Sequence, residues 1–237
     1  MKVIGLIGGM SWESTAAYYR LINEAVKTRL GGLHSARLVL YSVDMHEIDH
    51  LQHAGEWDAA GALLADAARA IEAAGAGCVV LCTNTMHKVA HAIEAAVDIP
   101  LLHIADATAD AVHQAGLSKV GLLGTRFTME QGFYKDRLHD RHGLQVLIPE
   151  APDREIVHRV IYQELCLGRT EDSSRSEYRR IMTELVARGA QAIILGCTEI
   201  GLLIDRSDAT IPLFDTTGIH AQAAVDWALD GGARRET

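Results

Sequence analysis

The sequence lacks a cationic block, a long apolar run and a regular spacing of cysteines, and each absence excludes a class of protein. Lys and Arg number 22 against 31 Asp and Glu, a formal net charge of −9, which leaves no basic face for nucleic acid or an anionic membrane. No run approaches the ~20 apolar residues of a transmembrane helix, and the first residues lead into a glycine-rich strand rather than a signal-peptide core. The four cysteines are irregularly spaced, which is typical of free thiols. We therefore expect a cytoplasmic protein that binds a small molecule and neither nucleic acid nor membrane.

Strand-like runs rich in Val, Ile and Leu alternate with stretches of helical period along the 237 residues. This alternation predicts an α/β fold of parallel strands with helices on both sheet faces. A helix over 57–74 should stop at Gly75, and a second one through Ile181 and Leu185 should stop at Gly189, because glycine commonly ends helices. The expected strands are 3–7, 38–41, 78–81, 101–103, 120–123, 146–148, 192–195 and 213–214.

The two halves of the sequence repeat the same landmarks in the same order at nearly the same separation. Lys-Val-Ile-Gly-Leu-Ile-Gly at 2–8 resembles Lys-Val-Gly-Leu-Leu-Gly at 119–124, and the Ile-Pro-Leu of 99–101 recurs at 211–213. A period this long indicates paired domains rather than a solenoid. We predict two pseudo-symmetric lobes, each a parallel sheet flanked by helices. The first comprises residues 1–103 with 213–237, whose closing helix packs back onto it, and the second comprises residues 104–212.

In each half an apolar strand runs directly into Cys-Thr, at Cys82 and again at Cys197. Lobes that face each other would bring these thiols to opposite walls of one cleft, where open α/β sheets bind ligands. A helix start after each strand should lower the thiol pKa through its unpaired N–H groups. The pair is therefore predicted to act as two acid/base groups, with a redox disulfide between them as the alternative. Cys78 and Cys166 lie in apolar or helical runs and are expected to be small hydrophobic residues.

Polar residues follow each cysteine at positions suited to an anion. Asn84, Thr85 and Thr198 should offer side-chain groups and helix-start N–H donors to a carboxylate, although ordinary helix capping would use the same residues. Glycine-containing turns at 8–11 and 124–125 follow the first strand of each lobe. There the missing side chain should let a ligand approach the backbone.

Two familiar motifs are only superficially present. His-Glu-Ile-Asp-His at 46–50 matches the zinc string H-E-x-x-H, but it carries an internal Asp and has no third ligand, so a solvated helix start is the better interpretation. His87, Lys88 and His91 are likewise expected to form one exposed helix face. The glycines of 5–9 lack the G-x-G-x-x-G spacing of dinucleotide sites, and no lysine has a Schiff-base setting. We expect no metal and no other cofactor, pyridoxal phosphate included.

Four motifs in order carry a resemblance to a known family: Gly-Gly-Met-Ser-Trp-Glu-Ser-Thr at 8–15, Leu-Cys-Thr-Asn-Thr-Met-His at 81–87, Leu-Gly-Thr at 123–125 and Leu-Gly-Cys-Thr-Glu at 195–199. Over nearly its whole length the chain resembles the aspartate/glutamate racemase family. The resemblance implies a pyridoxal-phosphate-independent amino-acid racemase, usually a homodimer, whose substrate lies between two catalytic cysteines.

The resemblance also implies a set of substrate-binding positions. Residues equivalent to Asn84, Thr85, Thr125 and Thr198 hold the α-carboxylate and the amino group. Arg159, just before a Val-Ile-Tyr segment, is the basic residue expected to read an acidic side chain. The whole set of substrate-binding residues that we predict is Met10, Ser11, Gln52, Thr83, Asn84, Thr85, Thr125, Arg159, Thr198 and Glu199, with Gln52 the weaker candidate for the side-chain pocket.

The function predicted at this point is racemisation of an aspartate- or glutamate-type amino acid by two cysteines. Three alternatives remain. The segments 11–15 and 164–168 resemble those of broad-specificity racemases, which act on neutral amino acids. The same thiols could serve a related isomerase or a hydantoin racemase. A non-catalytic amino-acid sensor would keep the cleft without turnover, but the presence of both cysteines disfavours it.

Overall fold

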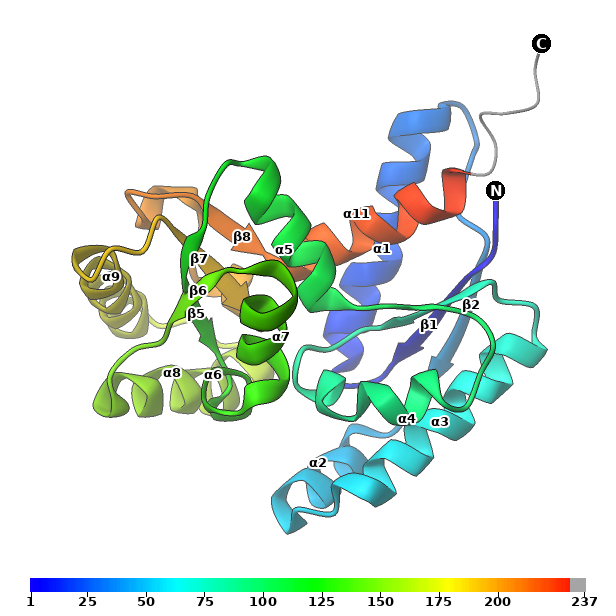
Figure 1. Cartoon of the computed structure of the whole chain (residues 1–237), viewed down its shortest axis with the longest axis horizontal. Helices are drawn as coiled ribbons and strands as arrows, with labels where there is room; N and C mark the ends of the chain where they lie inside the picture. The colour runs from blue at the N-terminus through cyan, green and yellow to red at the C-terminus, as the bar shows by residue number, and fades with distance from the viewer. Residues whose placement is uncertain (231–237) are drawn as a thin grey trace. The chain divides into compact units, whose positions relative to one another are not determined.

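The structure is a computed structural model that describes residues 1–230 (Figure 1). Its described residues divide into two compact units, one of residues 1–103 together with residues 220–230, and one of Ile104–Ile219. Each unit contains a four-stranded sheet in which all strand pairs are parallel. The α/β fold class predicted from the alternation of strands and helices is confirmed. None of the helices within residues 1–230 is long and apolar enough to cross a membrane.

The first unit has the sheet order β2-β1-β3-β4. Side chains of β1 and β3 alternate between the two faces of the sheet. Ile4, Leu6 and Val80 pack with the helices α1 (Trp12–Leu30) and α11 (Thr216–Leu229), whereas Ile7 and Val79 pack with α3 (Trp57–Ala73). This is the period-two pattern of a sheet covered on both sides. Its elements are β1 (Ile4–Gly8), α1 (Trp12–Leu30), β2 (Leu38–Ser42), α2 (Met45–Ala54), α3 (Trp57–Ala73), β3 (Cys78–Leu81), the 3₁₀ helix η1 (Thr85–Val89), α4 (Ala90–Glu94) and β4 (Leu101–Leu102).

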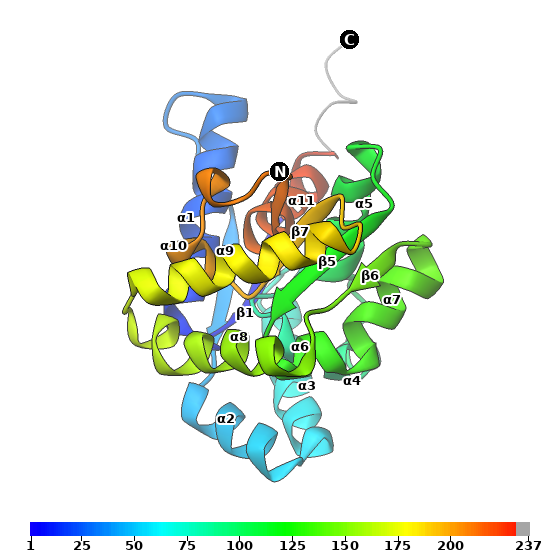
Figure 2. The same ribbon diagram turned by 90° about the vertical axis from the view of Figure 1, so that its left-hand side faces the viewer.

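The second unit repeats this arrangement with the order β6-β5-β7-β8. One sheet face packs against α5 and α7, and the other against α8 and α9, which lie side by side (Figure 2). Its elements are α5 (Ile104–Gln114), β5 (Lys119–Gly124), α6 (Arg126–Glu130), α7 (Gly132–His142), β6 (Gln145–Leu147), α8 (Ala151–Gln163), η2 (Leu165–Leu167), α9 (Asp172–Ala187), β7 (Ala192–Gly196), α10 (Ile200–Leu203), η3 (Arg206–Asp208) and β8 (Leu213–Asp215). The first four residues of α11 (Thr216–Leu229) follow β8 in this unit, and the remainder of α11 belongs to the first unit.

All eight expected strands are present within one or two residues of their predicted ends. The helices α3 and α9 stop before Gly75 and Gly189, whose φ angles of 92° and 94° favour glycine because a β-carbon is strained there. Each helix thus leads directly into the strand that precedes a cysteine.

The division of the chain differs from the predicted one near the C-terminus. The prediction placed residues 213–237 with the first lobe, but β8 pairs with β7 through the register Ile193↔Leu213, so residues 213–219 belong to the second unit. The boundary falls inside α11, between Ile219 and His220. From the sequence we also expect residues 231–237 to form a disordered tail; these residues lie outside the part of the chain that the structure describes.

Candidate active site

Cys82 and Cys197 occupy equivalent positions in the two units. Cys82 is the residue after β3, and Cys197 is the residue after β7; these strands stand at the same place in the two sheet orders. Each thiol therefore lies at the carboxyl edge of its parallel sheet, the edge where such sheets bind ligands. We call residues 82–85 the Cys82 loop and residues 197–199 the Cys197 loop. All four cysteines are free.

Cys82 is fully buried and packs among apolar side chains. Its Sγ lies 3.8 Å from the carbonyl oxygen of Val80, and its side chain belongs to the apolar cluster of Ile4, Leu6 and Tyr18. Burial raises the pKa of the Cys82 thiol well above its usual value. The predicted lowering by a helix start was wrong, because desolvation of the thiolate outweighs the dipole of a five-residue 3₁₀ helix that begins three residues later.

Buried side chains hold the backbone of the Cys82 loop. The Ser14 hydroxyl donates to the Cys82 carbonyl oxygen over 3.2 Å, and His87 Nδ1 lies 2.7 Å from the Thr83 carbonyl oxygen. Asn84 and Thr85 are buried, and the Asn84 side chain makes no capping bond to η1. Capping by Asn84, the structural alternative from the sequence, therefore does not account for this side chain.

The turn from Gly8 to Ser11 is built by the first turn of α1. Thr15 Oγ1 accepts from the Gly9 N–H and donates to the Ser11 carbonyl, each over 2.8 Å, and Ser11 caps α1 through a bond from the Ser14 N–H. A β-carbon on Gly9 would lie 2.0 Å from the Val43 carbonyl oxygen. This contact alone requires glycine at that position, whether or not a ligand approaches.

Met10 and Gln52, two further residues predicted to bind substrate, are buried in the first unit. Met10 packs in the same apolar cluster as Met86. Gln52, on α2, places its Nε2 2.9 Å from Met86 Sδ, and its Oε1 is buried without a hydrogen-bond partner. A buried acceptor without a hydrogen bond costs free energy. The Gln52 amide oxygen therefore favours a ligand with a hydrogen-bond donor.

The Cys197 loop, in contrast, contains a carboxylate. Glu199 Oε2 accepts from the Cys197 thiol over 2.9 Å and from the Thr198 hydroxyl over 2.5 Å. Burial first, and then the negative charge of Glu199, raise the pKa of Cys197 well above its usual value. The predicted lowering was therefore wrong here too.

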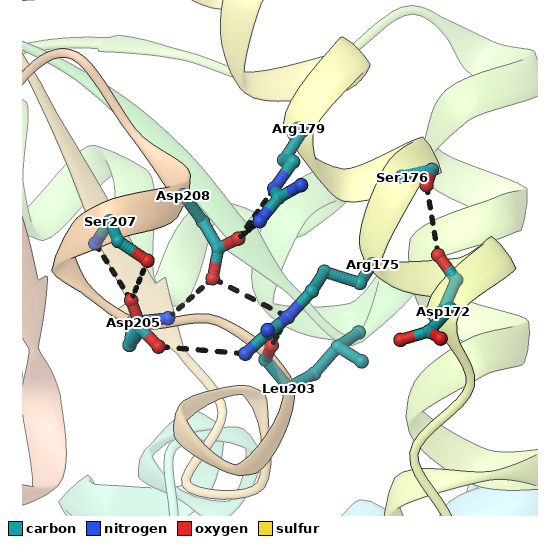
Figure 3. A network of polar contacts seen from close by, with 8 residues as sticks. All are labelled: Asp172, Arg175, Ser176, Arg179, Leu203, Asp205, Ser207 and Asp208. Carbon is teal, nitrogen blue, oxygen red and sulfur yellow. Dashed lines mark hydrogen bonds and ion pairs between the residues drawn. The ribbon is translucent and has the colours of Figure 1, made fainter.

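The segment after the Cys197 loop is anchored to α9 by an ionic network (Figure 3). Arg175 Nε donates to the carbonyl oxygen of Leu203, the last residue of α10, over 2.7 Å. The Asp208 carboxylate, fully buried, pairs with Arg179 at 2.5 Å and Arg175 at 3.5 Å and accepts from the Asp205 N–H. This network fixes the position at which α10 ends.

The remaining predicted residues of the second unit have simple surroundings. Thr125 is buried and caps α6 through a bond from the Thr128 N–H. Arg159 is exposed on α8 and makes no ion pair within residues 1–230. Their roles in substrate binding stay predictions.

The histidines at 46–50 and 87–91 differ in their outcome. His46 and His50 are exposed on α2, and no group of three metal-ligating side chains occurs among residues 1–230. The expectation that His87 is exposed was wrong: it is buried, whereas His91 is exposed. Residues 85–89 form a 3₁₀ helix before α4 begins, so His87 and His91 do not share the face that an uninterrupted α-helix would give them.

Comparison with known proteins defines the class. The model of the Asp/Glu/hydantoin racemase family matches residues 7–224, and the chain therefore belongs to this family of isomerases. A crystal structure described as a putative Asp/Glu racemase from Yersinia pestis is 60% identical, with a TM-score of 0.93 over 97% of this chain and 100% of that one.

Two further relatives extend the comparison. The crystal structure of an aspartate racemase homologue from Pyrococcus horikoshii OT3 is 33% identical, with a TM-score of 0.84 over 96% of this chain and 99% of that one. The broad specificity amino-acid racemase RacX of Bacillus subtilis is 22% identical over 96% of this chain and 98% of its own length. The family resemblance predicted from the four motifs is confirmed.

Proposed function

We propose that the protein is a cofactor-independent amino-acid racemase in which Cys82 and Cys197 exchange the α-proton of one substrate. The observation that carries the proposal is the equivalent position of the two thiols, each directly after the same strand of two sheets with the same order. Membership of a racemase family supports it. The proposal requires both thiols to reach one α-carbon from opposite faces.

In this mechanism one thiolate removes the α-proton and the other cysteine, as a thiol, returns a proton to the opposite face. Glu199 supplies a route to the Cys197 thiolate, since its carboxylate already accepts the thiol hydrogen bond. Because burial raises the pKa of both thiols, each thiolate is a stronger base once formed. A cysteine that has just donated its proton is left as the base for the reverse reaction.

The carbanion-like intermediate needs stabilisation without a cofactor. We assign this to donors around the substrate carboxylate from Asn84, Thr85, Thr125 and Thr198, with Met10, Ser11 and Thr83 completing the wall of the site. Fixed donors in a site without bulk water stabilise developing charge more strongly than water does.

We propose an acidic amino acid as substrate, because the exposed guanidinium of Arg159 can form two parallel bonds with a side-chain carboxylate. A second candidate is broad specificity toward neutral amino acids. The buried amide oxygen of Gln52, which has no hydrogen-bond partner, supports this candidate, because an acceptor repels a carboxylate and can bind a hydroxyl or amide donor. The similarity to RacX also supports it. Hydantoins remain a third substrate class by the family name alone.

We also propose that the protein is a cytoplasmic homodimer. Four free thiols fit a reducing compartment, and the dimer follows from the family resemblance. Sedimentation equilibrium at several concentrations tests the dimer; a single species of monomer mass throughout would reject it.

A substrate panel in D₂O tests the function directly. Each enantiomer of aspartate, glutamate, serine and methionine is incubated with purified protein, and deuterium at Cα is measured at low conversion. Two opposed bases place deuterium in the product but little in the recovered substrate. Equal deuterium in both would indicate a single base, and no turnover of any amino acid would reject the racemase proposal.

A further inference from the structure

Three buried histidines in the first unit have no part in the proposed chemistry. His87 on η1, His103 after β4 and His220 on α11 are at most 5% exposed, and the ring centroid of His87 lies 4.5 Å from that of His103 and 5.9 Å from that of His220. Burial of an imidazole costs free energy unless its ring nitrogens form hydrogen bonds. The hydrogen-bond partners of these rings therefore indicate which groups the histidines hold in position.

The proton positions of His220 follow from its partners. Its Nε2 lies 2.7 Å from the Leu102 carbonyl oxygen, which can only accept, so Nε2 carries the proton. Nδ1 then accepts from the Tyr18 hydroxyl over 2.9 Å. Burial lowers the pKa of His220 to about 4, which keeps the ring neutral near pH 7. The His220 ring therefore has a structural role and stays neutral.

His87 is fixed in the same way and points to the Cys82 loop. Its Nδ1 faces the Thr83 carbonyl oxygen at 2.7 Å, so Nδ1 is the donor. The preceding carbonyl, that of Cys82 itself, accepts from Ser14, which lies one turn before Tyr18 on α1. Two consecutive carbonyls beyond the end of β3 are thus held by side-chain donors in place of strand partners.

We infer that His87 is a positioning residue for the Cys82 thiol, acting through the bond from Nδ1 to the Thr83 carbonyl. The inference rests on the proposed two-thiol mechanism. Without this bond the Thr83 peptide can rotate, and the direction of the Cys82 side chain changes with it. A misplacement of about 1 Å can cost on the order of 100-fold in rate. Only the steps performed by Cys82 should suffer, because Cys197 belongs to the other unit.

Two substitutions of His87 distinguish the effect of losing the hydrogen bond to the Thr83 carbonyl from the effect of losing the imidazole ring. His87→Asn can place an amide N–H where Nδ1 stood, whereas His87→Gln places it nearer the position of Nε2. We expect His87→Asn to retain kcat within about fivefold and His87→Gln to lose about 30- to 100-fold in kcat with KM changed little. His91→Gln, on exposed His91, is the matched control and should behave as wild type.

Deuterium exchange supplies a readout that a general loss of structure would not produce. Cys82→Ser should stop racemisation while Cys197 still exchanges the α-proton of one enantiomer with D₂O. His87→Gln should show the same bias toward the same enantiomer. Equal loss of exchange for both enantiomers, or equal activities of the Asn and Gln variants, would overturn the inference.

A second variant keeps the test decisive if His87→Gln does not fold, as judged by circular dichroism. Ser14→Ala removes the donor to the Cys82 carbonyl and must show the same enantiomer bias; unbiased exchange in a folded Ser14→Ala protein would reject the anchoring of this loop by side-chain donors. Failure of the underlying mechanism is seen separately, since racemisation by Cys82→Ser would reject the two-thiol proposal whatever His87 does.

Discussion

The Cys82 and Cys197 loops stand at the same point of two similar sheets but are held by different chemistry. Neutral donors, Ser14 and His87, fix the first loop. A carboxylate touches the thiol of the second, and an arginine–aspartate network anchors the helix that follows it. Duplication thus keeps the position of a thiol, while each half anchors it through residues particular to that half. We expect the two directions of proton transfer to respond differently to substitution and to pH.

The largest expected effect comes from the thiols themselves. Cys82→Ser and Cys197→Ser should each reduce racemisation by about 1000-fold or more, because an alcohol is a far weaker acid than a thiol. Both variants should keep the fold, since serine is of similar size. Polarimetry and thermal unfolding measure the two properties. Near-wild-type racemisation by either variant would remove that thiol from the mechanism and end the comparison.

Glu199→Gln should sharpen the difference between the loops. The neutral amide cannot take the thiol proton, so exchange of the enantiomer served by Cys197 should fall by about 100-fold, while exchange through Cys82 serves as the internal control. Equal losses for both enantiomers would contradict this role.

The pH dependence of the reactivity of the Cys197 thiol tests the role of Glu199 independently of catalysis. The Glu199 carboxylate disfavours the thiolate and raises the pKa of Cys197, so its removal lowers that pKa, although burial still holds it above the usual range. Alkylation of Cys197 by iodoacetamide should therefore begin at lower pH in Glu199→Gln than in wild type, even though catalysis falls. An unchanged alkylation profile would show that the carboxylate does not control the thiol.

Much of this arrangement was predictable from the sequence. The remainder was not predictable, and the physical reasons can be named. Apolar runs ending at Cys82 and Cys197 predicted the strands and both thiol positions, because an apolar run and the residue that follows it are local signals. The inward turn of His87 depends on a 3₁₀ segment that resembles an α-helix in sequence. The pKa direction depends on burial, which outweighs helix dipoles. The bond from Arg175 to Leu203 joins elements far apart in the chain, and no periodic pattern marks such a pair.

Arg175→Gln tests the anchor of the second loop. It removes the bond to the Leu203 carbonyl and one of two guanidinium partners of buried Asp208, and should cost about 1–3 kcal/mol of unfolding free energy. Exchange through Cys197 should fall by about tenfold, with exchange through Cys82 unchanged. Arg206→Gln, on the exposed arginine of η3, is the matched control. Loss of stability without an enantiomer bias would make the network purely structural.

The smallest expected effect concerns which half reads the substrate side chain. The first unit offers the unmet amide oxygen of Gln52, and the second offers the guanidinium of Arg159. If Arg159 binds a substrate carboxylate, Arg159→Leu should lower kcat/KM for aspartate or glutamate about tenfold relative to a neutral amino acid, equivalent to about 1.4 kcal/mol. We expect no more than this, because Arg159 is exposed and solvent weakens the pair.

Gln52→Leu is the complementary variant and should act in the opposite sense. It removes an acceptor that repels carboxylates, so it should depress turnover of serine more than that of aspartate. Comparing kcat/KM for both substrates in the two variants decides between the halves. Equal losses on acidic and neutral substrates in Arg159→Leu, together with a selective loss on serine in Gln52→Leu, would assign side-chain recognition to the first unit and favour the broad-specificity enzyme.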